Sequence, residues 1–122
     1  MRLPWCPSSI MSRKIGDQAE QQALCFLQKK GFKLIQRNFS IKLGEIDLIG
    51  LLDNDLLFVE VKQRASGAFG SALEMVTIKK QQRIRKTAMV FLQQYQKYQH
   101  ANCRFDVIAI TDGKFEWVQD AF

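Results

Sequence analysis

Histidine, cysteine and proline are scarce in this 122-residue chain, and the first two shortages exclude whole classes of site. The single histidine, His100, is isolated, so we expect a surface position for it rather than a role in a catalytic dyad or triad. The three cysteines, Cys6, Cys25 and Cys103, are widely spaced and form no Cys-x-x-Cys pair. This spacing argues against a zinc ribbon and against a disulfide framework, and it is consistent with a cytoplasmic protein.

Long hydrophobic runs are also missing. No stretch of about 18 apolar residues occurs, so we expect no transmembrane helix and no membrane partner. Residues 1–10 contain both prolines and lack the apolar core of a secretion signal. We therefore predict a loosely ordered extension over residues 1–12 and a single domain over residues 13–122.

Positive charge is what the chain has in excess. Eighteen lysines and arginines against twelve acids give a formal net charge of +6 and a pI of about 9.4. An excess of this size indicates an anionic partner, with nucleic acid ahead of a membrane surface.

The most informative stretch covers residues 44–64. Two short apolar segments flank Asp53-Asn54, which is the pattern of a β-hairpin. If the turn centres on these two residues, Asp47 lies directly opposite Glu60, with Cβ atoms about 4.5–5.5 Å apart. The sequence therefore predicts two carboxylates side by side within an apolar hairpin.

This acid pair has two interpretations. Neighbouring carboxylates ionise with difficulty, and a hard divalent cation such as Mg²⁺ would turn that penalty into a binding site. Alternatively, Asp47 and Glu60 lie on a solvated face, where Lys62 and Glu45, also opposite each other, balance the charges. The hairpin alone favours neither interpretation.

The first predicted helix runs from Ser12 to about Lys30 and ends at Gly31. Glu20 lies on the margin of its apolar face, where an unpaired buried charge would be costly. Glu20 is therefore either the partner of a lysine or arginine in a salt bridge or a third acid of the site.

The second predicted helix runs from about Thr77 to Tyr98 and is the densest basic segment of the chain. Its cations are Lys79, Arg83 and Lys86 on the side away from the apolar stripe, flanked by Lys80 and Arg85. Such a face is either simply solvated or makes salt-sensitive contacts with a phosphate backbone. Together with the acid pair, phosphate contact is the better interpretation.

The remaining segments complete an α/β domain. The predicted strands are residues 32–39, the two arms of the hairpin, 104–110 and 115–118, and a glycine-rich loop covers residues 65–71. The order α-β-β-β-α-β-β predicts a mixed β-sheet flanked by two helices. For Asp106 we favour a structural partnership with a basic residue over an auxiliary role in the site.

This arrangement resembles the PD-(D/E)XK, restriction-endonuclease-like fold of type II restriction enzymes and archaeal Holliday-junction resolvases. The more specific similarity is to the YraN-like family of small bacterial proteins, for which endonuclease activity is inferred from the fold. The similarity starts at Gly16 and leaves out only the first dozen or so residues. The matching residues are Gly16, Glu20, Arg37-Asn38, 44–49, 58–64, Lys79, 104–107 and the C-terminal Trp117, Ala121 and Phe122. Ile46 stands where the motif has its nominal proline.

The resemblance implies metal-dependent hydrolysis of phosphodiester bonds in DNA, including branched or structured DNA. It implies Mg²⁺, replaceable by Mn²⁺, as the cofactor. The implied catalytic residues are Asp47, Glu60, Lys62 and Glu20. The implied metal ligands are Asp47, Glu60 and the backbone carbonyl of Val61. The implied nucleic-acid contacts are Arg64, Lys79, Arg83 and Lys86.

Two other functions stay open from the sequence. The chain is alternatively a non-catalytic nucleic-acid-binding module, or a partner-dependent subunit of a DNA repair, recombination or uptake assembly. RNA also fits as a ligand, because no residue pattern reads a 2′-hydroxyl group. A junction substrate would imply a homodimer, since two symmetric cuts need two sites.

Overall fold

The computed structural model describes residues 15–67 and 70–122. The expected extension over residues 1–12 and the expected helix cap at Ser12 lie outside this part of the chain. The elements are α1 (Ile15–Gln28), β1 (Lys33–Ile41), β2 (Gly44–Leu52), β3 (Asp55–Gln63), α2 (Ile78–Gln94), β4 (Asn102–Thr111) and β5 (Lys114–Val118), with 3₁₀ turns at Leu73–Met75 and Gln96–Tyr98. This order confirms the predicted α-β-β-β-α-β-β arrangement.

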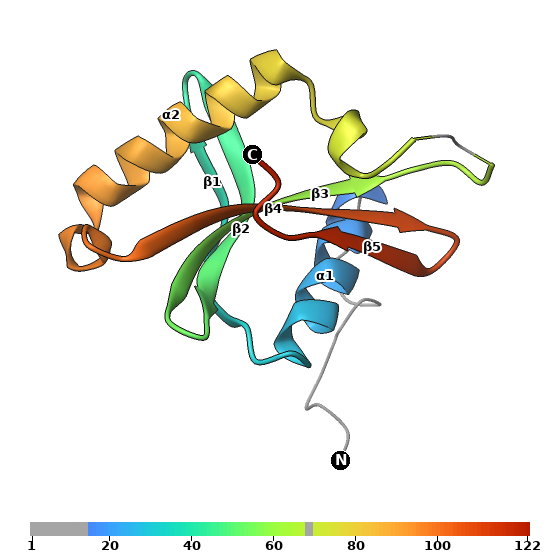
Figure 1. Cartoon of the computed structure of the whole chain (residues 1–122), viewed down its shortest axis with the longest axis horizontal. Helices are drawn as coiled ribbons and strands as arrows, with labels where there is room; N and C mark the ends of the chain where they lie inside the picture. Colours follow the sequence, from blue (N-terminus) through green and yellow to red (C-terminus); the bar gives the residue numbers. More distant parts are fainter. Residues whose placement is uncertain (1–14, 68–69) are drawn as a thin grey trace.

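The five strands form one sheet in the order β1-β2-β3-β4-β5. All neighbours are antiparallel except β3 and β4, which are parallel and are joined by the crossover through α2. The two helices cover opposite faces of this sheet (Figure 1). The crossover brings the start of α2 back beside the end of β3, where the predicted acids lie.

Each face of the sheet buries its own apolar core. The α2 side contains Ile49, Phe58, Ile84, Ala88, Phe91 and Val107. The α1 side contains Ala23, Leu27, Leu48, Leu57, Val59 and Ile108. Successive residues of β3 therefore alternate between the two cores, as the period-2 pattern of a strand that is buried on both faces requires.

The predicted hairpin register is confirmed. The pairs include Leu51 with Leu56 and Ile49 with Phe58, and the turn residues Asp53 and Asn54 have φ values of 51° and 80°. Positive φ at both central residues is typical of the two-residue turns that match the twist of a hairpin. The turn chemistry and the apolar pattern thus determine the same register.

The second helix is shorter than predicted. It begins at Ile78, where the Thr77 hydroxyl accepts a hydrogen bond from the backbone N–H of Lys80, and it ends at Gln94 rather than Tyr98. The last residues of the predicted helix form the 3₁₀ turn Gln96–Tyr98 instead. The first helix ends at Gln28 rather than at the predicted Lys30, and the turn that follows it contains Gly31 at a φ of 101°.

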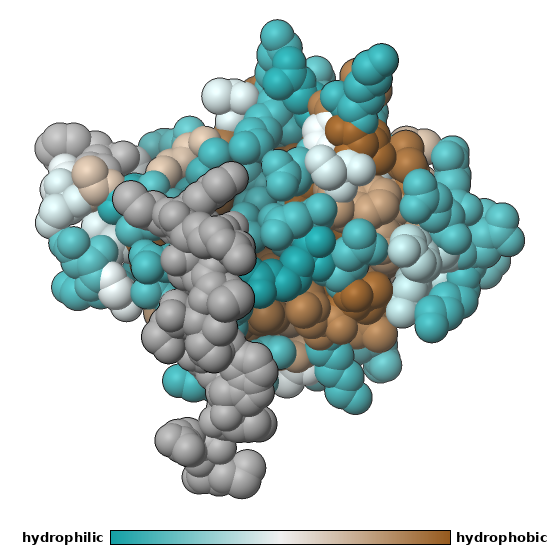
Figure 2. All heavy atoms as spheres, turned by 180° about the vertical axis from the view of Figure 1, so that it is seen from behind, coloured by the Kyte–Doolittle hydropathy of each residue, from teal (hydrophilic) through white to brown (hydrophobic). Residues whose placement is uncertain are grey.

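Seen from the side opposite to Figure 1, the described residues present a mostly hydrophilic face, with apolar side chains in its lower half and toward the upper right (Figure 2). His100 is exposed, as predicted. No helix of the described part combines the length and the apolar character that crossing a membrane requires.

One expectation about the cysteines is wrong. Cys25 is buried and disulfide-bonded, whereas the spacing of the cysteines argued against a disulfide framework. Cys103 is a free, partly buried thiol. Sequence spacing failed here because it carries no information on which thiols approach each other in the fold.

Candidate metal and phosphate site

Asp47 and Glu60 lie side by side at the end of the β2–β3 hairpin. The last backbone pair of the ladder is Leu48 with Val59, so the two acids follow directly beyond it. The Oδ2 atom of Asp47 accepts a 2.8 Å hydrogen bond from the backbone N–H of Val61, which binds Asp47 to β3 through its side chain. The register predicted from the sequence therefore places both carboxylates as expected.

Burial and like charge disfavour the ionised form of Asp47. Burial is the largest cause and the negative charge of Glu60 the next, and together they raise the pKa of Asp47 to about 8. Glu20 adds to this rise through its charge and a hydrogen bond, and the donated N–H of Val61 offsets it only in part. Glu60 is buried and Asp47 is partly exposed, so the pair does not lie on an open solvated face, although Lys62 pairs with Glu60 as that interpretation expected.

Two lysines approach the buried carboxylate of Glu60, whose side chain is 5% exposed. The Nζ atom of Lys80 lies 2.7 Å from Oε2 of Glu60, and that of Lys62 lies 3.7 Å from the same oxygen. Burial lowers the pKa of Lys62, and neighbouring Lys80 lowers it further. For Lys80 burial also lowers the pKa, but its hydrogen bond to Glu60 and the charge of Glu60 outweigh this, so that the pKa is raised. Lys80 is therefore the principal counter-ion of Glu60.

The acids open into a pocket of about 390 Å³. Its lining includes the turn between β1 and β2, residues 40–45, and the first part of α2, with Lys80, Arg83 and Ile84. A Cβ atom at Gly44 would lie 2.8 Å from Oγ1 of Thr87, so a glycine lets the turn lie directly against the helix. The pocket thus combines two carboxylates with at least two cations.

Glu20 reaches the acid pair from α1, on the other face of the sheet. Its carboxylate interacts with that of Asp47 and lies 3.9 Å from Nη2 of Arg37. Both interpretations of Glu20 therefore hold in part, because the residue forms a salt bridge and also contacts the site. This placement fits a role in orienting Asp47.

The donor set fits a divalent cation held by two carboxylates. Among residues 15–67 and 70–122, no group of three or more histidine, cysteine, aspartate or glutamate side chains is arranged to hold a metal ion. Mg²⁺ typically binds one or two carboxylates and completes its shell with waters and substrate phosphate. Asp47 and Glu60 meet that requirement, and the ammonium group of Lys80 shows that Glu60 accepts a cation from the pocket side.

The predicted nucleic-acid contacts do not form one cluster. Arg83 lines the pocket, whereas Lys79 and Lys86 are exposed on α2. Arg85, which flanks them in the sequence, instead covers the rings of Phe105 and Phe122 at 5.2 and 5.4 Å. The basic helix therefore contributes one predicted cation to the pocket and two to the surrounding surface.

Arg64 is held by structural contacts. Its guanidinium donates to Oγ1 of Thr111 and to the carbonyl of Gly70, and it pairs with Glu116 at 3.1 Å. These bonds fasten the start of the 65–71 loop to β4 and β5. Its side chain is 14% exposed, which leaves little of it for a phosphate.

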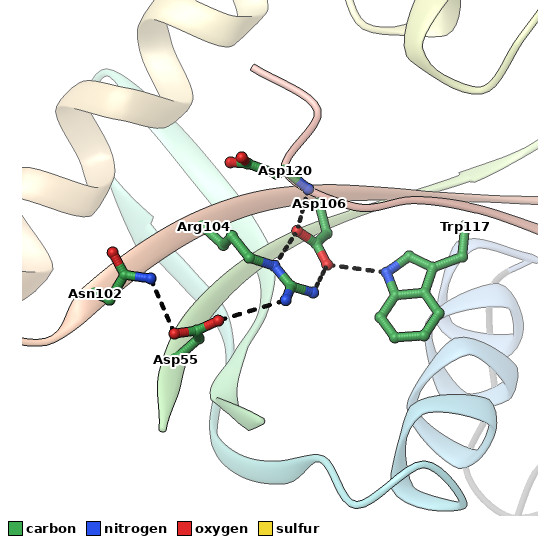
Figure 3. A network of polar contacts seen from close by, with 6 residues as sticks. All are labelled: Asp55, Asn102, Arg104, Asp106, Trp117 and Asp120. Atoms are coloured by element: carbon green, nitrogen blue, oxygen red, sulfur yellow. Dashed lines mark hydrogen bonds and ion pairs between the residues drawn. The ribbon is translucent and has the colours of Figure 1, made fainter. Parts of the chain in front are cut away.

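Asp106 is structural, as favoured from the sequence (Figure 3). The carboxylate is fully buried and accepts hydrogen bonds from Arg104, from the Trp117 indole and from the backbone N–H of Asp120. Arg104 also pairs with Asp55 at 3.5 Å. None of these residues lines the pocket.

Sequence reasoning missed Lys80 and the β1–β2 turn. Lys80 was treated as a flanking surface cation, yet it makes the shortest ion-pair contact to Glu60. One signal was present, because a helix that follows β3 in a parallel crossover begins near the end of β3, which bears Glu60. The turn gave no such signal, since its approach to α2 depends on tertiary packing.

Comparisons with known proteins identify the family. Residues 19–110 match the family described as "Uncharacterised protein family UPF0102". A UPF0102 protein of Acinetobacter baumannii (strain SDF) is 48% identical over 99 residues, which cover 81% of this chain and 74% of the relative. A UPF0102 protein of Francisella tularensis (strain FSC 198) is 41% identical over 110 residues, which cover 89% and 94%. The chain therefore belongs to the uncharacterised protein family UPF0102.

Proposed function

We propose that this protein is a metal-dependent endonuclease that hydrolyses phosphodiester bonds in DNA. The observation that carries the proposal is the partly exposed Asp47 beside the buried Glu60, which line one pocket together with Lys80 and Arg83. Two adjacent carboxylates, one of them buried, raise the free energy of the folded state. Binding of a divalent cation and a phosphate group at this site would offset that cost.

Asp47, Glu60 and the carbonyl of Val61 would hold Mg²⁺ or Mn²⁺. The bound ion would polarise the scissile phosphate and lower the pKa of a bound water. Lys62, 3.7 Å from Glu60, would position that water or neutralise charge that develops on the phosphate. Glu20 would orient Asp47 from beneath the sheet, and Arg83 would hold a flanking phosphate.

The placement in the PD-(D/E)XK superfamily is part of this proposal. It is supported by the mixed five-stranded sheet and by the position of Asp47, Glu60 and Lys62 on adjacent hairpin strands, beyond the last backbone pair of their ladder. The names of the family and of its relatives state no activity, so the similarity supports membership of the family, and the proposed chemistry rests on the site. A cytoplasmic location and a DNA partner belong to the same proposal.

The test is cleavage of a labelled panel of single-stranded, duplex, flapped and four-way-junction DNA with Mg²⁺ or Mn²⁺ and with EDTA controls. Asp47→Asn and Glu60→Gln should abolish metal-dependent cutting. Asp53→Asn is the matched control, because Asp53 lies in the exposed turn of the same hairpin and should leave cutting unchanged. Cutting that persists in both site variants would refute the assignment.

A non-catalytic nucleic-acid-binding module is the second candidate. The 2.7 Å contact between Lys80 and Glu60 favours it, because a lysine can neutralise the buried acid without any metal. This candidate predicts metal-independent binding of the panel and no cutting. A partner-dependent subunit would show neither activity until its partner is added.

A further inference from the structure

We propose that Lys80 and the divalent cation compete for Glu60, and that Lys80, once displaced, binds a phosphate of the substrate. The inference rests on the proposed function and assigns Lys80 a role in coupling the two ligands. Lys80 would be a positioning residue for the substrate.

The contact geometry distinguishes Lys80 from Lys62. Lys80 approaches Glu60 from α2 at 2.7 Å, while Lys62 belongs to the same strand as Glu60 and lies 3.7 Å away. The side chain of Lys80 is 41% exposed, against 26% for Lys62. A lysine is a compact charge on a flexible stem, so Lys80 can leave the carboxylate without movement of the backbone.

The charges around Glu60 are the reason that Lys80 and a divalent cation would compete for it. Asp47 and Glu60 carry two negative charges when ionised, and Lys62 and Lys80 already supply two positive charges around Glu60. A divalent cation on the same carboxylates would meet the ammonium group of Lys80 at close range, where like charges repel strongly. Departure of Lys80 removes that repulsion.

The pocket gives Lys80 a new partner. Lys80 and Arg83 both line it, so a displaced Lys80 remains beside a second cation in the space where a phosphate would lie. Lys80 and Arg83 would then bind a phosphate group in the same pocket whose carboxylates, Asp47 and Glu60, would hold the metal ion. Metal and phosphate would consequently bind with positive cooperativity, since each favours the same position of Lys80.

Mn²⁺ binding to the full chain, measured by electron paramagnetic resonance at one fixed pH without nucleic acid, tests the competition. Lys80→Gln should bind Mn²⁺ about tenfold more tightly than the wild type, because a competing charge is gone. Lys79→Gln is the matched control. Lys79 is the adjacent, exposed lysine of the same helix and should leave the affinity unchanged.

Lysine reactivity supplies a second readout that does not depend on affinity. Acetylation followed by mass spectrometry should show Lys80 becoming more reactive on addition of Mg²⁺, while Lys79 stays constant. Further addition of a short single-stranded oligonucleotide should protect Lys80 again. Thermal melting of both variants confirms that they are folded.

The outcomes separate this inference from the function it rests on. Mn²⁺ binding of equal strength in the wild type and Lys80→Gln, with unchanged Lys80 reactivity, overturns the competition and leaves the nuclease proposal standing. Mn²⁺ binding that is absent from the wild type, Lys80→Gln and Lys79→Gln alike overturns the metal site, and the competition with it. Tighter binding in Lys80→Gln alone supports both.

Discussion

At the scale of single residues, the site is defined by Asp47, whose carboxyl group is kept from ionising easily by burial and by the charge of Glu60. Asp47 keeps a raised pKa although the Val61 N–H donates to it, because burial and Glu60 act more strongly. An arrangement of this kind lowers the stability of the fold and favours the binding of a cation. The proposed metal binding and the stability of the fold therefore oppose each other at Asp47.

Asp47→Asn should stabilise the protein at alkaline pH in the presence of EDTA. The pKa of Asp47 rises from 3.8 to about 8 on folding, so the folded state holds this proton more tightly than the unfolded state. The resulting stabilisation is fully present below pH 3.8 and is lost as pH rises through about 8. The free energy of unfolding of the wild type should fall relative to Asp47→Asn by about 2–5 kcal/mol over this range.

Urea denaturation of both proteins at several pH values between those limits measures the difference. Asparagine retains an oxygen for the Val61 N–H, so the substitution changes mainly the charge. Parallel stability curves for the two proteins would mean that the Asp47 carboxylate ionises as freely in the fold as in the unfolded chain.

At the scale of elements, the pocket exists because the β1–β2 turn lies against α2. Gly44 permits this contact, since a Cβ atom there would come within 2.8 Å of Oγ1 of Thr87 and 3.3 Å of the carbonyl of Arg83. The turn carries no catalytic group of its own among the predicted residues. Its contribution is to form part of the lining of the pocket.

Gly44→Ala should destabilise the protein by about 1–3 kcal/mol, because the added methyl group pushes the turn away from the helix. It should also weaken Mn²⁺-dependent DNA binding, since the pocket wall moves. Chemical denaturation and fluorescence anisotropy measure the two effects. Thr87→Ala in the Gly44→Ala background removes the closest atom and should restore part of the stability. If the stability does not recover, contact with Thr87 is not the cause of the destabilisation.

At the scale of the whole molecule, the described cations that contribute to the net charge of +6 fall into two groups, those bonded within the fold and those free to contact a ligand. Some cations are used to hold the fold, as Arg64 does through Thr111, Gly70 and Glu116, and Arg104 does through Asp55 and Asp106. Others, including Arg83 in the pocket and the exposed Lys79 and Lys86, remain available for phosphates. The basic surface that is available to a polyanion is thus smaller than the lysine and arginine count implies.

DNA binding should weaken with salt according to the number of available cations. Arg83→Gln should reduce the slope of log K against log [salt] by about 0.9, the value for one lost phosphate contact. Arg64→Gln should leave the slope unchanged and lower stability instead, because its guanidinium is bonded within the fold. Binding titrations at several salt concentrations measure both slopes. If Arg64→Gln reduced the slope as much as Arg83→Gln does, Arg64 would also contact the nucleic acid.

Much of the fold and the centre of the site follow from local sequence. The turn residues Asp53 and Asn54 and the apolar pattern around them determined the hairpin register, and the register placed Asp47 beside Glu60. Helix α2 was predicted from the spacing of its apolar residues, although it ends at Gln94 and not at the predicted Tyr98. These features are local, since turn geometry and side-chain periodicity act over a few residues.

Tertiary structure decided the partners of each charge. Lys80 and Arg83 enter the pocket, Arg85 covers two aromatic rings and Arg64 fastens a loop, although all four are basic residues in or near the predicted phosphate-binding segments. The physical reason is that a charged side chain on a long flexible stem pairs with whatever group the packed elements bring within reach. The sequence by itself determined the strands, the helices and the acid pair, whereas only the packing of α2 against the sheet determined which cations face it.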